Sequence, residues 1–297
     1  MRIAITGSTG LIGSALVAAL EADGHAITRV VRPASSAQGV LWDPERGTID
    51  LNGLEGHEAV IHLAGEQIAG LWTKERKRRI RESRTRGTAL LATSLTRLRR
   101  PPAVLVSASA IGFYGDRPSS EPVDETDRKG SGFLADVSDA WERATDPARE
   151  GGIRVANTRF GLVLSRRGGA LAPLLCVFRL GLGGKIGSGQ QTWSWVAIDD
   201  VVGAVRFVIA TAALEGPVNV VAPFPVSNLA FTRALGRVLR RPTLFAVPEI
   251  VLRTVAGEMA RELLLFGVRA VPRKLLDAGY EFRYPEVETA LKHVLKP

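Results

Sequence analysis

The stretch RIAITGSTGLIGSALVAALEADGHAITRVV, residues 2–31, decides the fold. It opens on a short apolar run, and Gly7, Gly10 and Gly13 follow at three-residue spacing. An apolar-periodic helix is predicted next, and residues 26–31 return to the pattern of a strand. A strand, a glycine-rich turn, a helix and a second strand together predict the βαβ unit of a Rossmann fold.

Each glycine of this turn has a physical role in a nucleotide site. Gly7 permits a sharp exit from the strand, Gly10 leaves room for a pyrophosphate near the backbone, and Gly13 lets the helix pack closely on the sheet. The free N–H groups of the helix that begins near Leu11, together with its dipole, would hold the phosphate charge. The stretch therefore predicts a dinucleotide cofactor.

The end of the second strand indicates which dinucleotide binds. NAD sites usually carry Asp or Glu there to bond the adenosine ribose, whereas sites for the 2′-phosphorylated cofactor have an Arg nearby. This strand ends in Val31, Arg32 and Pro33, without a carboxylate. We therefore predict NADP, with Arg32 near its extra phosphate. The alternative is that Arg32 is only a solvated strand end.

The composition is that of a globular protein. A chain of 297 residues with 45% apolar residues can bury a sizeable core in one large domain or in a domain with an attached lobe. We find no secretory signal and no apolar stretch long enough to cross a bilayer, so a cytoplasmic protein without a membrane partner is expected. The single cysteine, Cys176, and the scattered histidines predict neither a disulfide nor a metal site.

The net charge of +9 raises the question of nucleic-acid binding. Much of that charge lies in KERKRRIRESRTR, residues 74–86, whose spacing suggests one exposed helical face. The segment has no interleaved aromatic residues for base stacking. A basic helix beside the phosphates of NADP explains the charge better, so we expect a small-molecule substrate and no nucleic-acid partner.

The rest of the chain alternates strand and helix patterns. The continuous apolar run at 59–63 reads as a central parallel strand, residues 103–106 as another buried strand and residues 154–164 as a further strand, and residues 73–98 read as a long helix. This order predicts an α/β protein with a Rossmann-like, doubly wound parallel sheet. We expect an NADP-binding domain at 1–240, including a substrate loop at 181–195, and a small, mostly helical C-terminal lobe at 241–297 that closes the substrate cleft.

Several segments resemble a known family. HLAG (62–65), SASAIGFYG (107–115) and WVAIDD (195–200) resemble the extended short-chain dehydrogenase/reductases. More narrowly, FRLGLGGKIGSGQQ (178–191) and the segment at 268–291 are similar to an atypical, NAD-dependent epimerase/dehydratase-like subgroup often called "epimerase family protein". The resemblance covers nearly the whole chain.

The resemblance implies a catalytic Ser after the fifth strand and a Tyr whose pKa is lowered by a Lys four residues on. Ser109 matches the Ser, with Ser107 as the alternative. In FLADVSDAWE, however, Leu134 stands where the Tyr belongs and Ser138 where the Lys belongs. Tyr114 is the nearby phenol and is predicted as the acid/base group, although the family commonly uses that position for positioning.

The resemblance also implies binding residues. Those expected to contact the cofactor are Gly7, Thr9, Gly10, Leu11, Ile12, Arg32, Leu63, Ala64, Arg84, Phe160, Gly161 and Leu162. Those expected on the substrate side are Glu66, Gln67, Lys185, Gln190 and Trp195. Lys185 could instead be a solvated loop residue, and Trp195 the edge of a core. Asp199 and Asp200 are expected to cap the helix that follows them.

These features predict an NADP-dependent oxidoreductase or epimerase/dehydratase-like enzyme that lacks the usual Tyr-x-x-x-Lys pair. Its substrate would be a small carbonyl, hydroxyl or sugar-like molecule. The alternative is a non-catalytic NADP-binding sensor or scaffold that kept the cofactor cleft and lost the proton relay. The sequence leaves the oligomeric state open between a monomer and a homodimer.

Overall fold

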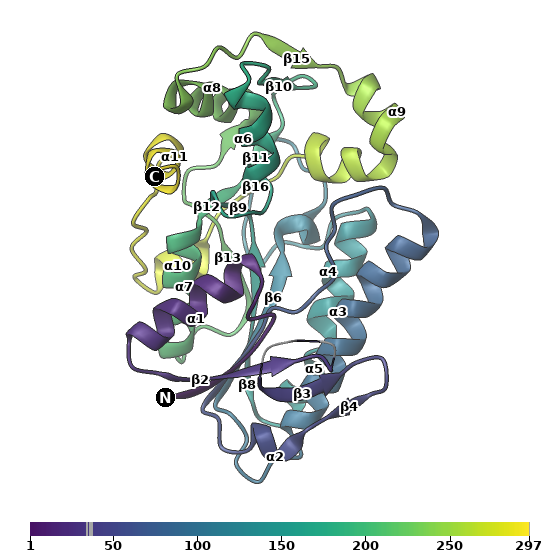
Figure 1. Ribbon diagram of the computed structural model, residues 1–297, viewed down its shortest axis with the longest axis vertical. Helices are drawn as coiled ribbons and strands as arrows, with labels where there is room; N and C mark the ends of the chain where they lie inside the picture. The colour runs from purple at the N-terminus through teal and green to yellow at the C-terminus, as the bar shows by residue number, and fades with distance from the viewer. Residues whose placement is uncertain (34, 36–37, 297) are drawn as a thin grey trace.

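An eight-stranded sheet forms the lower part of the molecule (Figure 1). Its strands are β1 (Arg2–Thr6), β2 (Ala26–Val31), β3 (Val40–Asp43), β4 (Thr48–Ile49), β5 (Ala59–His62), β6 (Val104–Ala110), β8 (Arg154–Phe160) and β13 (Gly216–Val220). They lie in the order β13-β8-β6-β5-β1-β2-β3-β4, all parallel except the β3–β4 pair. The computed structural model describes residues 1–33, 35 and 38–296.

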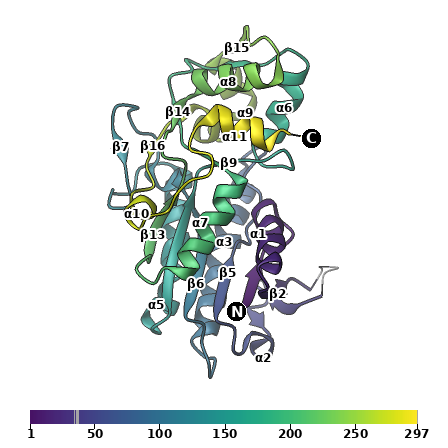
Figure 2. The same cartoon turned by 90° about the vertical axis from the view of Figure 1, so that its left-hand side faces the viewer.

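Helices cover both faces of this sheet (Figure 2). They are α1 (Leu11–Ala22) and α7 (Ile198–Ala210) on one face, and α2 (Leu51–Leu54), α3 (Lys74–Leu95), α4 (Phe133–Arg143) and α5 (Asp146–Glu150) on the other. Successive residues of a strand point to opposite faces. Ile3 and Ile5 accordingly pack with Leu16 of α1, whereas Ala4 packs with Leu91 of α3. The doubly wound parallel fold predicted from the sequence is confirmed.

The upper part of the molecule has its own hydrophobic cluster. It is built around α6 (Leu171–Arg179), α8 (Asn228–Leu239), α11 (Val287–Val294) and β12 (Trp195–Ala197). The remaining elements are β7 (Pro122–Val123), β9 (Leu162–Leu164), β10 (Gly184–Ile186), β11 (Thr192–Trp193), β14 (Val226–Ser227), β15 (Phe245–Val247), β16 (Arg269–Ala270), α9 (Glu249–Ala260), α10 (Arg273–Asp277), the 3-10 helix η1 (Ile111–Tyr114) and the π-helix η2 (Arg261–Leu265). The cluster combines segments before and after residue 240, and the division of the chain at that residue stays a prediction.

The run at 154–164 is two strands rather than the one we expected. β8 ends at Phe160, and β9 leaves the sheet to pair with β12. Gly161 makes the break, because a Cβ there would lie 2.6 Å from the carbonyl oxygen of Ser194 and 2.7 Å from Cγ1 of Val221. β8 ends where Gly161 approaches Ser194 and Val221 closely. Strand propensity along the chain does not predict this break, because both neighbours are distant in sequence.

The strand order reverses between β1 and β5, the switch point of the sheet. Helices follow β1 on one face and β5 on the other. The region outside the carboxyl ends of these strands, called the crevice, is where folds of this kind bind ligands. None of the described helices is long and apolar enough to cross a membrane. No group of His, Cys, Asp and Glu side chains suited to a metal ion occurs within 1–33, 35 and 38–296.

We expect Gly13→Ala to destabilise the fold. A Cβ at Gly13 would lie 2.1 Å from the carbonyl oxygen of Gly7, so α1 would have to move off the turn, at a cost on the order of 3 kcal/mol. Chemical denaturation measures the free energy of unfolding. Gly168→Ala is the matched control, because its Cβ would meet Leu11 at an ordinary 3.7 Å. Equal stability of the two variants would contradict this packing.

Candidate functional site

The turn between β1 and α1 exposes the start of a helix. Gly10 is the N-cap residue, with φ −73° and ψ 175°, and no described side chain caps the helix. Its own N–H donates to the carbonyl of Gly7 at 3.0 Å. The N–H groups of Leu11 and Ile12 have no intrahelical acceptor, as in any first helical turn. Such a turn is suited to an anionic ligand such as a phosphate.

The same turn packs against the end of β5. Gly7 has φ +66°, and a Cβ there would lie 2.9 Å from the backbone nitrogen of Ala64 and from the carbonyl carbon of Leu63. Only glycine fits a left-handed conformation at so close an approach. The structure therefore brings together the predicted cofactor residues of the turn and those that follow β5.

A buried hydrogen-bond network fixes this junction. The hydroxyl of Thr6 accepts the N–H groups of Leu63 at 3.1 Å and Ala64 at 3.2 Å. Because both N–H groups use the oxygen as acceptor, the hydroxyl proton of Thr6 is donated to Nδ1 of His62, at 2.8 Å. Nε2 of His62 must then carry the ring proton and donate to Thr88 of α3, at 2.9 Å. One threonine and one neutral histidine thus tie β1, β5 and α3 together at the crevice.

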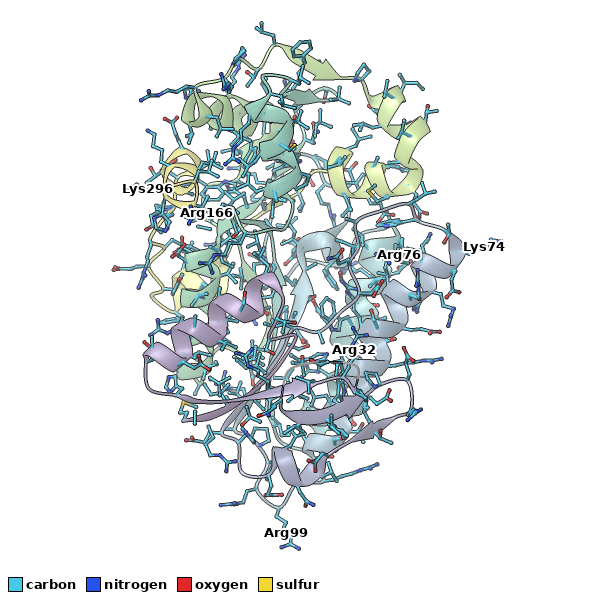
Figure 3. The ribbon with its side chains drawn as sticks, in the orientation of Figure 1. Arg32, Lys74, Arg76, Arg99, Arg166 and Lys296 are labelled. Carbon is cyan, nitrogen blue, oxygen red and sulfur yellow. The ribbon has the colours of Figure 1, made fainter. Side chains whose placement is uncertain are left out.

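Arg32 lies at the outer side of this crevice. It directly follows β2, its side chain is exposed, and Figure 3 labels it. No carboxylate occurs among residues 30–33, and the N–H of Ser35 bonds to the carbonyl of Arg32 at 2.9 Å. The end of β2 therefore offers a positive group to a ligand bound along the crevice.

The loop after β5 is held from below by α3. Arg84 is half-buried and donates to the carbonyls of Glu66 at 3.0 Å and Ile80 at 3.1 Å. Its guanidinium lies 4.9 Å from the ring of Trp141. Burial lowers the pKa of Arg84 to about 10, so the group stays charged at neutral pH. Arg84 thus supports the loop with a partly buried positive charge.

Arg76 fixes the outer part of the same loop. It forms an ion pair with Glu66 and donates to the carbonyl of Gln67 at 2.7 Å. Glu66 is half-buried, whereas the Gln67 side chain is exposed. Glu66 and Gln67, predicted on the substrate side, therefore lie beside Leu63 and Ala64, but the charge of Glu66 is already paired.

Ser109 lies on the sheet face covered by α4. Its hydroxyl donates to Oε1 of Glu142 at 2.6 Å, and both carboxylate oxygens of Glu142 accept from Arg159, at 2.7 and 2.8 Å. Ser109 is 3% exposed. The alternative, Ser107, is fully buried, and its hydroxyl has no hydrogen-bond partner in the described part of the chain.

The positions of the missing Tyr and Lys face the turn after β6. A Cβ at Gly112 would lie 3.2 Å from Cβ of Leu134 and 3.9 Å from the hydroxyl oxygen of Ser138. These two side chains therefore occupy the place that the sequence comparison assigned to the proton relay. An isobutyl group has no proton to give, and the Ser138 hydroxyl, 3% exposed, is almost closed off from solvent.

Tyr114 is placed differently from our expectation. It is fully buried, its hydroxyl donates to Oδ1 of Asn219 at 2.8 Å, and it accepts from Arg159 at 2.9 Å. Burial raises the pKa of Tyr114 to about 12, despite the opposing charge of Arg159. A phenol with that pKa is a weak acid at neutral pH. The contacts suit a positioning role, and none supports the predicted acid/base role.

The predicted substrate residues do not form one cluster. Trp195 is fully buried in the upper hydrophobic cluster, and its indole N–H donates to the carbonyl of Phe224 at 3.2 Å. The expectation that Trp195 contacts substrate was therefore wrong, and the alternative of a core position holds. Lys185 is half-buried in β10, and Gln190 is exposed. Its carbonyl accepts the hydroxyl of Ser119 at 3.2 Å.

Asp199 and Asp200 do not cap α7, whose start has no side-chain cap. Asp200 accepts the N–H groups of Arg283 at 2.7 Å and Tyr284 at 3.0 Å. Asp199 pairs with His293 at 3.1 Å. The capping expectation was wrong because both carboxylates serve the returning C-terminal segment, which lies about ninety residues further along the chain.

The C-terminal segment reaches over the site through two carboxylates that we did not predict. Glu262 of η2 accepts the N–H groups of Phe133 and Leu134, both at 2.8 Å, and so caps α4 from outside. Glu258 of α9 pairs with Lys77 of α3 at 2.8 Å. The capping of α4 has no signal in the sequence, because the carboxylate comes from a residue 129 positions away.

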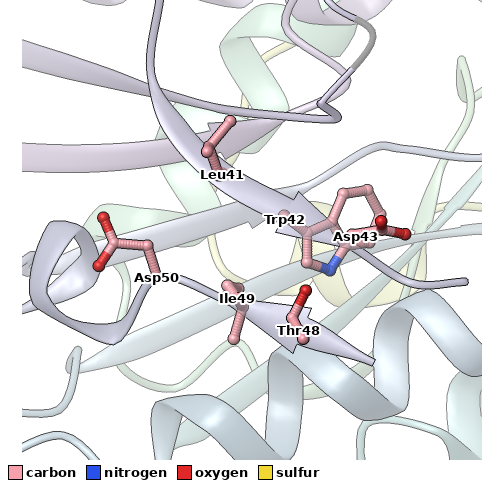
Figure 4. Close-up of a pocket in the computed structure, with 6 residues that line it drawn as sticks. All are labelled: Leu41, Trp42, Asp43, Thr48, Ile49 and Asp50. Atoms are coloured by element: carbon pink, nitrogen blue, oxygen red, sulfur yellow. The ribbon is translucent and has the colours of Figure 1, made fainter. Parts of the chain in front are cut away.

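A surface hollow of about 260 Å³ lies at the β3–β4 hairpin (Figure 4). Its two carboxylates are already used by the backbone, because Asp43 accepts from Glu45 and Arg46, and Asp50 accepts from Gly53. The hollow is lined by Leu41, Trp42, Asp43, Thr48, Ile49 and Asp50.

Comparison with known families decides the affiliation. Residues 3–222 match the model described as "NAD dependent epimerase/dehydratase family". The chain belongs to this family. Residues 247–294 match a second model, described as "Domain of unknown function (DUF1731)". The resemblance drawn from the sequence is thereby confirmed.

Full-length relatives agree with this affiliation. Epimerase family protein Mb2239 of Mycobacterium bovis is 43% identical over 291 residues, which cover 97% of this chain and 96% of that protein. The human epimerase family protein SDR39U1 (isoform 2), crystallised with NADPH, is 33% identical with a TM-score of 0.90, covering 99% of both chains. A nucleoside-diphosphate sugar epimerase from Corynebacterium glutamicum is 36% identical with a TM-score of 0.81, covering 99% of this chain and 58% of that one.

We expect His62 to make the stability of this family member depend on pH. Burial lowers the pKa of His62 from 6.5 to about 4, so the unfolded chain takes up the proton first. The contribution of His62 to the free energy of unfolding is fully present above about pH 6.5. It falls by about 3 kcal/mol as the pH drops towards 4, and below that pH this group causes no further loss.

Denaturation of the wild type and of His62→Leu across this pH range measures the effect. The variant should be less stable at neutral pH, because Thr6 and Thr88 lose their partner, and should show a smaller loss of stability on acidification. His25→Asn, outside the network, is the control and should keep the wild-type profile. The same pH profile in His62→Leu and in the wild type would show that His62 does not titrate as described.

Proposed function

We propose that this protein is an NADP(H)-dependent oxidoreductase, or an epimerase/dehydratase-like enzyme, acting on a small carbonyl, hydroxyl or sugar-like substrate. The observation that carries the proposal is the crevice at the ends of β1, β2 and β5. An uncapped helix start lies beside a strand end that bears Arg32 and no carboxylate. The NADPH crystallised with human SDR39U1 supports the same cofactor here.

The proposed cofactor site uses the residues that line this crevice. The pyrophosphate would lie on the first turn of α1, and Arg32 would bind the 2′-phosphate. Arg84 would add positive potential from beneath the loop after β5. The nicotinamide end would lie toward the β8–β9 junction. The proposed contacts are Gly7, Thr9, Gly10, Leu11, Ile12, Arg32, Leu63, Ala64, Arg84, Phe160, Gly161 and Leu162.

The chemistry that a bound nicotinamide supplies is hydride transfer. Ser109 is the proposed ligand of the substrate oxygen. Its hydroxyl donates to Glu142 in this structure, so it offers lone pairs and suits a substrate that donates an O–H. To bind a carbonyl, the hydroxyl must turn away from Glu142. Tyr114 then acts through Arg159, which holds Glu142, and is a positioning residue.

The substrate side of the proposal is reduced to four residues. Glu66 and Gln67 follow β5 beside the cofactor residues, and Lys185 and Gln190 belong to the loop at 181–195. These groups are polar and at least partly accessible, which suits a small molecule with hydroxyl or carbonyl groups. Cytoplasmic location, the oligomeric state and the lack of a nucleic-acid partner stay predictions.

A non-catalytic NADP-binding sensor or scaffold is the second candidate. The observation in its favour is that Leu134 and Ser138 fill the place of the usual proton relay. A protein that binds the cofactor without turning it over would need the crevice and not the relay. The two candidates share one cofactor site and differ only in what happens beside it.

Arg32→Asp should exchange the cofactor preference. Removing the guanidinium and adding a carboxylate should weaken NADPH binding at least about tenfold, while the affinity for NADH stays equal or rises. Fluorescence titration with both cofactors measures this. Arg99→Asp, at an exposed arginine that lies at the lower tip of the molecule and away from Arg32 (Figure 3), is the control. Equal affinities for NADPH and NADH in the wild type would remove the NADP assignment.

Turnover separates the two candidates. We expect the wild type to consume NADPH with a member of a panel of carbonyl compounds and nucleotide sugars, and Ser109→Ala to lower kcat about a hundredfold with unchanged NADPH affinity. Tyr114→Phe should act mainly on the free energy of unfolding, which falls because Asn219 and Arg159 lose a buried partner, and should have a smaller effect on kcat. Tight NADPH binding without turnover across the panel would favour the sensor.

A further inference from the structure

The end of the molecule opposite the β3–β4 hairpin includes α8, β15 and α9 (Figures 1 and 2), and it carries exposed apolar side chains. Leu244 is 86% exposed, Ile250 70% and Val255 72%, values usual for polar side chains. Most of the large exposed apolar residues of the described chain lie here. The apolar surface consists of Val177, Leu180, Leu182, Leu244, Phe245, Ile250, Val251 and Val255.

These residues come from three segments that lie side by side. The chain after α6 runs into β10, which pairs with β15, with Gly184 opposite Phe245. A Cβ at Gly187 would meet Leu265 at 3.2 Å and Cβ of Glu249 at 3.8 Å, so α9 and η2 lie next to β10. The segments that carry the exposed apolar side chains are therefore neighbours at this end of the molecule, and exposed apolar residues gathered in this way are typical of interaction sites.

Unpaired arginines border this surface. Arg179, Arg240 and Arg241 are exposed, and no ion pair or side-chain hydrogen bond is recorded for them among the described residues. Arg240 and Arg241 line a hollow of about 430 Å³ with Arg233 and Arg237, of which Arg237 pairs with Glu288. The surface is thus apolar in the middle and positive at its edge.

The carboxylates of the same end are already used. Glu249 pairs with Arg253, Glu258 with Lys77, and Glu262 caps α4. Any partner that covers the apolar surface must therefore supply negative charge itself. A second copy that used the same surface would bring Glu249, Glu258 and Glu262, which are already bound within their own chain, so these carboxylates offer no free charge to Arg240 and Arg241.

We propose that this apolar surface docks on an anionic lipid bilayer. A helix and a strand that present Leu, Ile, Val and Phe outward, bordered by arginines, match the chemistry of an interface with acyl chains and acidic headgroups. None of the described helices could cross a membrane, but docking on the surface of a bilayer does not require one that does. The inference does not depend on the cofactor site.

Co-sedimentation of the full-length protein with vesicles tests this proposal. With equimolar phosphatidylcholine and phosphatidylglycerol, binding should be at least about tenfold stronger than with phosphatidylcholine alone, and high salt should reverse it. Arg240→Glu with Arg241→Glu should lower binding to the acidic vesicles at least about tenfold. Leu244→Ser with Ile250→Ser should lower it similarly, because the inserted apolar area is lost.

Matched controls carry the same changes at distant exposed positions. Arg97→Glu with Arg99→Glu, and Leu41→Ser with Leu276→Ser, should bind vesicles like the wild type. NADPH titration and thermal unfolding show whether each variant is folded. Equal binding to neutral and acidic vesicles, or none to either, would overturn the proposal. So would a dimer in light scattering that Leu244→Ser with Ile250→Ser dissociates, because a second copy would then cover the surface.

Discussion

The hydroxyl of Thr6 is the constraint on which the site depends. It lies at the last residue of β1, and two backbone N–H groups from the end of β5 converge on it, while its own proton goes to His62. No water is needed to satisfy this junction, so the two strand ends can come together without an unpaired polar group. The glycine turn can then approach Leu63 and Ala64 closely, and the crevice takes its shape from that approach.

A second polar network lies on the same sheet face, one strand further on. Ser109, Glu142, Arg159, Tyr114 and Asn219 form a chain of buried hydrogen bonds. A buried charge pair of this kind is strongly destabilising to break, because it leaves an uncompensated charge. This network places Ser109 beside the turn after β6 and fixes its hydroxyl. Leu134 and Ser138, where the resemblance expects the Tyr and Lys, lie next to the same turn.

The C-terminal segment couples the two parts of the molecule. Glu262 caps α4, which carries Leu134, and Asp200 of α7 accepts the N–H groups of residues 283 and 284. The segment is therefore bonded to a helix on each face of the sheet. The apolar surface includes exposed residues of this segment, from Leu244 to Val255, together with residues at 177–182. α9, which carries part of that surface, is followed directly by η2, whose Glu262 caps α4.

The sequence by itself determined the sheet and the glycine turn, because both depend on local periodicity and on glycines at fixed spacing, and motifs along nearly the whole chain resembled the family. It also shows that α4 contains no Tyr or Lys. The tertiary structure alone decided that Trp195 is core, that Tyr114 is bound to Asn219, and that Asp200 and Glu262 hold distant backbone. A residue type records which bonds it can form, but the partner depends on which distant segment folding brings beside it.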